Sequence, residues 1–209
     1  MLFNKAQATL SERRFPEFVA LASTQNASSG TTLVINKPTG TVQGDLMVAF
    51  MASNASASWS GDTGWTEVVD QAGTRPALRV AYKVAGASEG GSYTFTASVS
   101  EPHSGSILTY RYASYDGVSS LVTGADPLVV PSISPASKAI LLAFGAISSA
   151  SVTLGTPSGM TAVVTENDST SPSYIICSQS VSPGSTGTRS ISTGSTVNVA
   201  GVMLTIAPA

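Results

Sequence analysis

Short apolar or alternating segments recur along the whole chain, and clusters of Gly, Ser, Pro and Asn separate them. Such alternation is typical of strands, and the residues between them favour turns. Helical spacing is weak and confined to the first 14 residues. Because no helices intervene, the pattern favours an antiparallel sandwich over a parallel α/β sheet. The predicted strands are Phe18–Ala22, Leu33–Asn36, Leu46–Ala52, Thr66–Asp70, Leu78–Val84, Ser92–Ala97, Ser106–Arg111, Leu128–Pro131, Ala139–Ile147, Ala162–Thr165, Tyr174–Val181, Thr188–Ser192 and Val197–Ile206.

An internal repeat relates the two halves of the chain. Six segments of the first half match six of the second in the same order, at offsets of 94 to 96 residues. Leu46–Phe50 matches Ile140–Phe144, for example, and Gly105–Thr109 matches Gly201–Thr205. Leu46–Phe50 and Ile140–Phe144 are apolar at consecutive positions, so we expect both strands to be central and buried on both faces.

Two arrangements would explain the repeat: two small sandwiches in tandem, or one larger sandwich with halves related by a pseudo-twofold axis, as in a jelly roll. We favour the single jelly-roll-like sandwich, because the connection Tyr112–Asp126 is short and contains Tyr, Val and Leu. The predicted organisation is an N-terminal arm of residues 1–16 followed by one sandwich of residues 17–209. The sandwich consists of two repeats, about 17–111 and 112–209.

The first half contains, in this order, the motifs Lys37-Pro38, Gly44–Phe50, Gly64–Thr66, Tyr82–Ala85 and Ser92–Thr96. Together these motifs resemble a β-sandwich module of tailed-phage structural proteins. The resemblance implies a virion location and a structural role, and it supplies no catalytic residues. We therefore expect a non-enzymatic capsid decoration or cement protein that contacts other virion proteins and forms a homo-oligomer, with a trimer as one arrangement. The alternative is a tail-fibre or tail-tip module that binds a receptor or a cell-surface glycan.

Composition narrows the function classes further. Charged residues make up 11% of the 209 residues, and the formal net charge is −2. Binding to nucleic acid rests on many Lys and Arg contacts with phosphate, so this composition argues against it. A surface covered instead by Ser, Thr, Gly and Asn associates readily with other proteins. We find no secretory signal and no apolar run long enough for a membrane span, so we expect synthesis in the host cytoplasm.

Residues with catalytic or metal-binding chemistry are sparse. His103, the only histidine, is expected in a solvated turn, and Cys177, the only cysteine, in the core. One cysteine and one histidine cannot build the usual zinc site, so no metal and no cofactor are predicted. The acidic residues are scattered, and Glu67 and Asp70, three positions apart, are not expected to share one face of a strand. Glu166 is matched to Glu67 only loosely by the repeat.

Two groups of residues are candidates for contact with a partner. The N-terminal arm combines large apolar residues with basic ones, a combination that often marks a protein contact. The second group is aromatic: an exposed ring would stack on a sugar or enter a neighbouring subunit. The alternative for Trp59 is a core position that closes the edge of the sandwich. The docking candidates are Leu2, Phe3, Leu10, Arg13, Arg14 and Phe15, and the glycan or subunit candidates are Trp59, Tyr112 and Tyr115.

Overall fold

The computed structural model describes residues 13–61, 63–124, 126–149, 152–167, 172–194 and 198–209. These residues form strands and loops and contain no helix, which confirms the predicted all-β class. The strands are β1 (Glu17–Asn36), β2 (Leu46–Ser53), β3 (Trp59–Ser60), β4 (Thr66–Gln71), β5 (Ala77–Val84), β6 (Ser92–Arg111), β7 (Ala113–Val118), β8 (Val122–Gly124), β9 (Leu128–Val130), β10 (Ala139–Ile147), β11 (Thr161–Glu166), β12 (Ser173–Val181), β13 (Arg189–Ile191) and β14 (Val199–Pro208).

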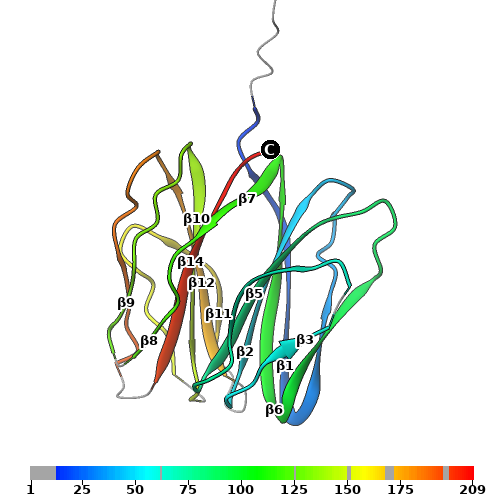
Figure 1. Ribbon diagram of the computed structural model, residues 1–209, viewed down its shortest axis with the longest axis vertical. Coiled ribbons are helices and arrows are strands. Elements are labelled where there is room, and N and C mark those ends of the chain that lie inside the picture. Colours follow the sequence, from blue (N-terminus) through cyan, green and yellow to red (C-terminus); the bar gives the residue numbers. More distant parts are fainter. Residues whose placement is uncertain (1–12, 62, 125, 150–151, 168–171, 195–197) are drawn as a thin grey trace, which may run out of the picture.

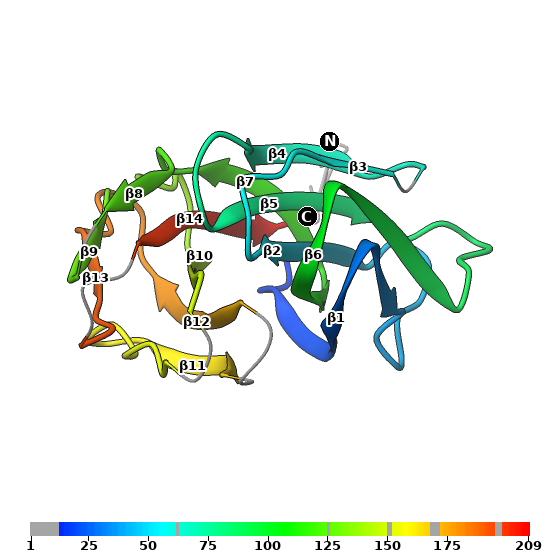
Figure 2. The same ribbon diagram turned by 90° about the horizontal axis from the view of Figure 1, so that it is seen from below.

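Two large antiparallel sheets stand side by side (Figure 1). The first sheet has the order β1-β6-β2-β5-β4, and β3 is added to β6. The second sheet has the order β11-β12-β10-β14-β7, and β8 is added to β14. A small third sheet, β13-β9, covers the outer side of the second sheet (Figure 2).

The strand pairings of the two halves correspond to one another. In the first sheet β2 lies between β6 and β5, and in the second sheet β10 lies between β14 and β12. Phe50 pairs with Ser106 and Phe144 pairs with Val202, so the matched positions differ by 94 (144 − 50) and 96 (202 − 106). The offsets of the sequence repeat therefore recur in the pairings. The jelly-roll description and the twofold relation remain predictions.

Three separate cores hold these layers together. The central core lies between the two large sheets, where the rings of Phe50 and Phe144 approach to 5.0 Å between centroids. The opposite face of the first sheet forms the first outer core, which includes Met51 and Phe95. The opposite face of the second sheet forms the second outer core, beneath β9 and β13. All residues of β2, and all but Ile140 of β10, are buried, which confirms that both strands are central.

Two strands are longer than the sequence predicts. The segments expected at Phe18–Ala22 and Leu33–Asn36 are parts of the single strand β1, and those expected at Ser92–Ala97 and Ser106–Arg111 are parts of β6. The expected turn around His103 is therefore wrong. β1 and β6 pair along their whole length and pass together from the outer layer into the first sheet, with register shifts between Asn26 and Thr32.

The segment between the repeats is also structured. β7 and β8 both pair with β14, so residues 113–124 form part of an edge of the second sheet. Tyr112 stands alone between β6 and β7. The connection is therefore part of the scaffold, and a single residue, Tyr112, links the last strand of the first sheet to the second sheet. That the repeats form one cooperative domain remains a prediction.

Candidate functional site

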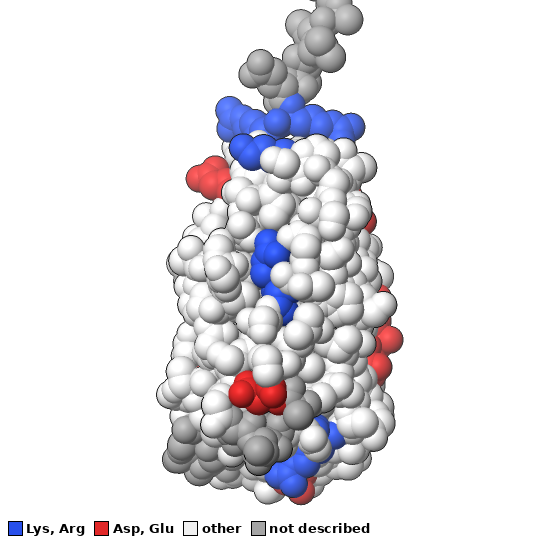
Figure 3. Space-filling model, turned by 90° about the vertical axis from the view of Figure 1, so that its left-hand side faces the viewer, with Lys and Arg blue, Asp and Glu red and all other residues white. Residues whose placement is uncertain are grey.

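Basic and aromatic side chains gather at the end of the sandwich where β1 begins. Arg13 and Arg14 are exposed, and Lys138 lies over the ring of Phe15 at 4.8 Å. Figure 3 shows a band of basic side chains at this end, above a flank that carries few charges. Among the described residues, no carboxylate lies within ion-pair distance of Arg13, Arg14 or Lys138. We call these three residues, with Phe15 and Tyr112, the basic end.

Tyr112 holds the chain in place at the basic end. The Arg14 guanidinium donates a hydrogen bond of 2.6 Å to the Tyr112 hydroxyl and lies 4.8 Å from the centre of its ring. Such cation–π contacts stabilise an exposed pair by about 0.5–1 kcal/mol. Tyr112 has a φ of 56°, in the left-handed region that costs a residue with a Cβ roughly 1–2 kcal/mol. The link between the sheets thus holds an exposed ring in a strained position beside the arm.

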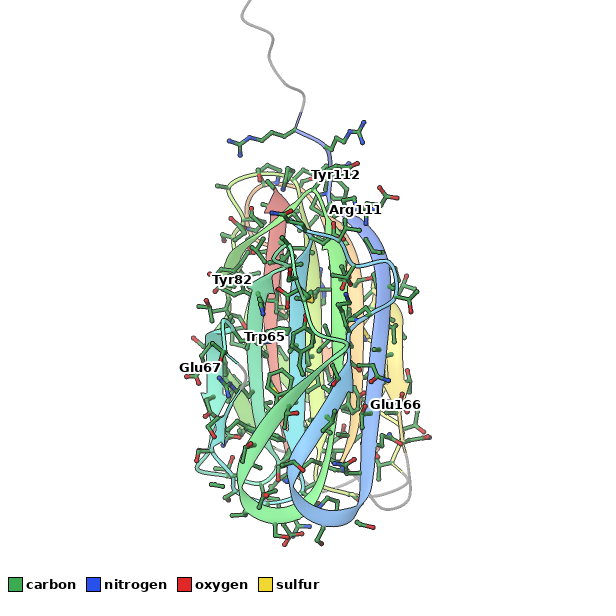
Figure 4. All side chains as sticks on the ribbon, turned by 90° about the vertical axis from the view of Figure 1, so that its right-hand side faces the viewer. Trp65, Glu67, Tyr82, Arg111, Tyr112 and Glu166 are labelled. Atoms are coloured by element: carbon green, nitrogen blue, oxygen red, sulfur yellow. The ribbon has the colours of Figure 1, made fainter. Side chains whose placement is uncertain are left out.

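A hollow of about 310 Å³ lies next to Tyr112. Arg111 lines it and donates hydrogen bonds of 2.9 and 3.0 Å to the two carboxylate oxygens of Asp45. These bonds raise the pKa of Arg111. Figure 4 shows Arg111 and Tyr112 together at this end of the molecule. Because Asp45 is buried and engages the Arg111 guanidinium, this charge stabilises the scaffold, while Arg13 and Arg14 face solvent. The hollow is lined by Val42, Gln43, Gly44, Asp45, Arg111, Tyr112 and Ala209.

The predicted docking residues fall into two groups. Arg13, Arg14 and Phe15 belong to the basic end. Leu2, Phe3 and Leu10 lie outside the described residues.

The three predicted aromatic contacts do not form one platform. Trp59 is only 4% exposed and its ring packs edge-on against His103, which agrees with the core alternative and rules out the exposed indole that a sugar platform needs. β3 pairs with β6 and places this side chain in the first outer core. Tyr115 stacks on Tyr82 with ring centres 4.7 Å apart. Tyr112 alone presents a substantial part of its ring to solvent, at 36% exposure.

Two carboxylates of β4 lie on one face of the strand, which their spacing in the sequence did not predict. Glu67 lies opposite Ala81, and Asp70 lies opposite Arg79. Ala81 and Arg79 share one face of β5, so the two carboxylates also share a face, contrary to the prediction. The reason is a register shift between Glu67 and Val69, which adds one residue as a β-bulge does. No sequence signal marks this irregularity.

These carboxylates serve the scaffold. Glu67 lies 3.5 Å from the Nε atom of the buried Arg79, and Asp70 accepts a hydrogen bond of 3.1 Å from the Trp59 amide. Figure 4 places Glu67 and Glu166 at opposite edges of the molecule, so they do not form a catalytic pair. In the described part of the chain, no three His, Cys, Asp or Glu side chains gather closely enough to hold a metal ion.

The only histidine and the only cysteine are both buried. His103 shares a hydrogen bond of 2.8 Å with the Gly30 carbonyl oxygen, and burial lowers its pKa, although the Gly30 and Val99 backbone acts in the opposite direction. Burial raises the pKa of the Cys177 thiol to about 11, so the thiolate is scarce at neutral pH. The prediction of a core cysteine is confirmed.

Comparisons with known proteins add no relative. No protein-family model matches the chain, and no curated protein and no solved structure matches it either. Within the described ranges, no helix has the length and apolar character needed to cross a membrane.

Proposed function

We propose that this chain is a non-enzymatic virion structural protein of a tailed phage, a decoration or cement protein that attaches to the capsid through its basic end. The observation that carries the proposal is that Arg13, Arg14 and Lys138 gather at one end without a carboxylate within ion-pair distance among the described residues, beside the partly exposed Tyr112. Such an end suits a partner surface that presents carboxylates beside apolar groups.

The internal use of polar side chains supports a structural role. Asp45, Arg79 and His103 are buried and contact other parts of the scaffold, and Cys177 lies in the second outer core. A protein that acts by binding needs a rigid scaffold and an exposed contact surface, and both features are present. The sequence resemblance to phage β-sandwich modules agrees with this role.

The test is attachment to particles of the source phage assembled without this protein. Arg13→Ser combined with Arg14→Ser should weaken attachment at least about tenfold, because two charges and the Arg14–Tyr112 contact are lost. Arg75→Ser is the matched control and should attach normally, because it removes one exposed charge beside Asn54, at the end of β2 opposite to Asp45 and the basic end. Absence of the chain from purified virions, or unchanged attachment of the double variant, would overturn the proposal.

The second candidate is a tail module that binds a glycan. It rests on Tyr112, whose partly exposed ring borders the hollow beside Arg111. A glycan array with the wild type and with Tyr112→Ala tests it directly. A sugar bound by the wild type and lost in the variant would favour this function over attachment to the head.

A further inference from the structure

The outer edge of β1 is open. β1 is the last strand of the first sheet, and among the described residues only β6 pairs with it. From Ala20 to Asn26 the register with β6 is continuous, so this stretch is a regular strand. Alternate backbone N–H and C=O groups of such a strand point away from its neighbour and need a partner or water.

From Ala20 to Asn26 this edge lacks the features that normally protect an edge strand. Charged side chains, prolines and bulges prevent unwanted strand pairing. β4 carries Glu67 and Asp70, and its register is interrupted after Glu67; β11 ends in Glu166, and its register is interrupted after Ala162. β1 contains no charged residue and no proline from Phe18 to Asn36, and its own register shifts lie on either side of Ala20–Asn26, before Ala20 and after Asn26.

Apolar side chains accompany the open backbone. Phe18 is 45% exposed and Leu21 is 37% exposed, and both lie opposite residues of the central core, Tyr110 and Leu108. They therefore extend the apolar face that the first sheet turns toward the second sheet. Figure 2 shows β1 at the outer margin of its sheet, on the same side of the molecule as β11. A strand added beside β1 would cover part of this face.

We propose that β1 pairs through residues Ala20–Asn26 with the same strand of a second copy of this chain, giving a twofold dimer with one continuous sheet. A second copy presents an uncharged strand of equal length, so antiparallel pairing brings no like charges together. The contact is isologous and closes at two copies. A charged partner strand would find no complementary charge on this edge.

The dimer is independent of the proposed attachment. The twofold axis crosses the paired strands, so the two basic ends face away from each other and remain free. Self-association and attachment are therefore measured separately, and either can fail without the other.

Sedimentation velocity from about 1 to about 300 µM tests the dimer. We expect the wild type to dimerise and Leu21→Lys to weaken dimerisation at least about tenfold, since it places two like charges near the axis. Val84→Lys, at an exposed apolar residue at the end of a non-edge strand, is the matched control and should dimerise normally. A monomer at every concentration, or a dimer unaffected by Leu21→Lys, would overturn the proposal.

Hydrogen exchange of the wild type provides a measurement that needs no variant. Protection of amides in residues 20–26 should increase with protein concentration, because outward-facing N–H groups gain partners in the dimer. Protection that rises elsewhere while these amides stay unchanged would place the contact on another surface and refute the β1 interface.

Discussion

The two outer cores differ in their side chains although the strands beneath them correspond. The first outer core contains Trp59, Tyr93 and Phe95, and Trp65 packs against the last two with ring centres 5.2 and 5.5 Å away. The second outer core has no aromatic residue and consists of Leu, Ile, Val, Met, Ala and Cys side chains. Its cover, β9 and β13, has three residues per strand, whereas the first is covered by parts of the 20-residue strands β1 and β6 and by β3.

One matched position shows how this difference arises. Met51 pairs with Gly105 in the first sheet, and Gly145 pairs with Gly201 in the second. A Cβ atom on Gly145 would lie 2.6 Å from the side chain of Ile191 on β13. The small sheet therefore packs directly against the glycine of the second sheet, while at the matched position of the first sheet the side chain of Met51 fills the outer core. The paired framework is shared, and the two outer cores are filled by side chains of different volume.

The largest effect on folding is expected when the first repeat is produced without the second. A fragment of residues 1–112 retains its outer core but exposes the apolar face that includes Val48, Phe50 and Leu108. We expect it to aggregate or to give a poorly dispersed amide NMR spectrum. A folded, monomeric fragment would show that the halves are independent domains.

The next test removes the ring contact between the sheets. Phe50→Ala and Phe144→Ala should each lower the free energy of unfolding by about 3–5 kcal/mol, because both rings are fully buried. Urea denaturation measures this, and the double variant should cost less than the sum because the rings touch. A loss below about 1 kcal/mol at either site would contradict the central position of that ring.

Two matched glycines provide a smaller effect. A Cβ atom on Gly105 would lie 2.6 Å from the Phe50 carbonyl oxygen, and one on Gly201 would lie 3.1 Å from that of Phe144. Overpacking of this kind costs about 1–3 kcal/mol. Gly105→Ala should therefore destabilise the protein more than Gly201→Ala in thermal or urea unfolding. The reverse order would show that the first sheet is the more adaptable one.

The smallest expected effect is a pH dependence of the free energy of unfolding that arises from His103, in the first half of the chain. Val199 occupies the position that matches His103, since it pairs with Ile147 as His103 pairs with Ser53. The unfolded chain binds a proton at His103 below about pH 6.5, whereas the folded chain binds it only at lower pH. Unfolding thus takes up a proton, and stability should fall as the pH decreases from 7 toward 5.5.

His103→Val should remove this decrease in the free energy of unfolding between pH 7 and 5.5. Urea denaturation at a series of pH values measures it. Because the chain has a single histidine, no other imidazole can supply it. An equal slope in the variant would refute the role of His103.

The sequence predicted the framework well because the framework depends on local alternation and on the repeat. Leu46–Phe50 and Ile140–Phe144 are central, as their unbroken apolar character indicated. The full length of β1 and β6 was not predicted, because both strands continue through polar segments, and β6 through a proline as well. In these segments backbone pairing with a distant strand outweighs the local turn preference. The burial of His103 follows from the continuity of β6, which its polar neighbourhood does not reveal.

The candidate site was predicted in part. Arg13, Arg14 and Phe15 were identified from apolar and basic residues beside one another, a pattern that composition makes visible. The contribution of Lys138 and the contact of Arg14 with Tyr112 depend on pairings between distant segments. The shared face of Glu67 and Asp70 depends on a register shift that no residue type specifies.

The pairing of β7 with β14 has a consequence for synthesis on the ribosome. Asp116 on β7 accepts a hydrogen bond from Thr205, which follows it by 89 residues. The first sheet has all its strands once Arg111 is made, but this edge of the second sheet waits for nearly all of the second half. A nascent chain therefore carries a complete first sheet with an uncovered apolar face while the last 98 residues (209 − 111) are made. Delayed closure through such distant contacts slows folding and makes this stage the one most exposed to aggregation.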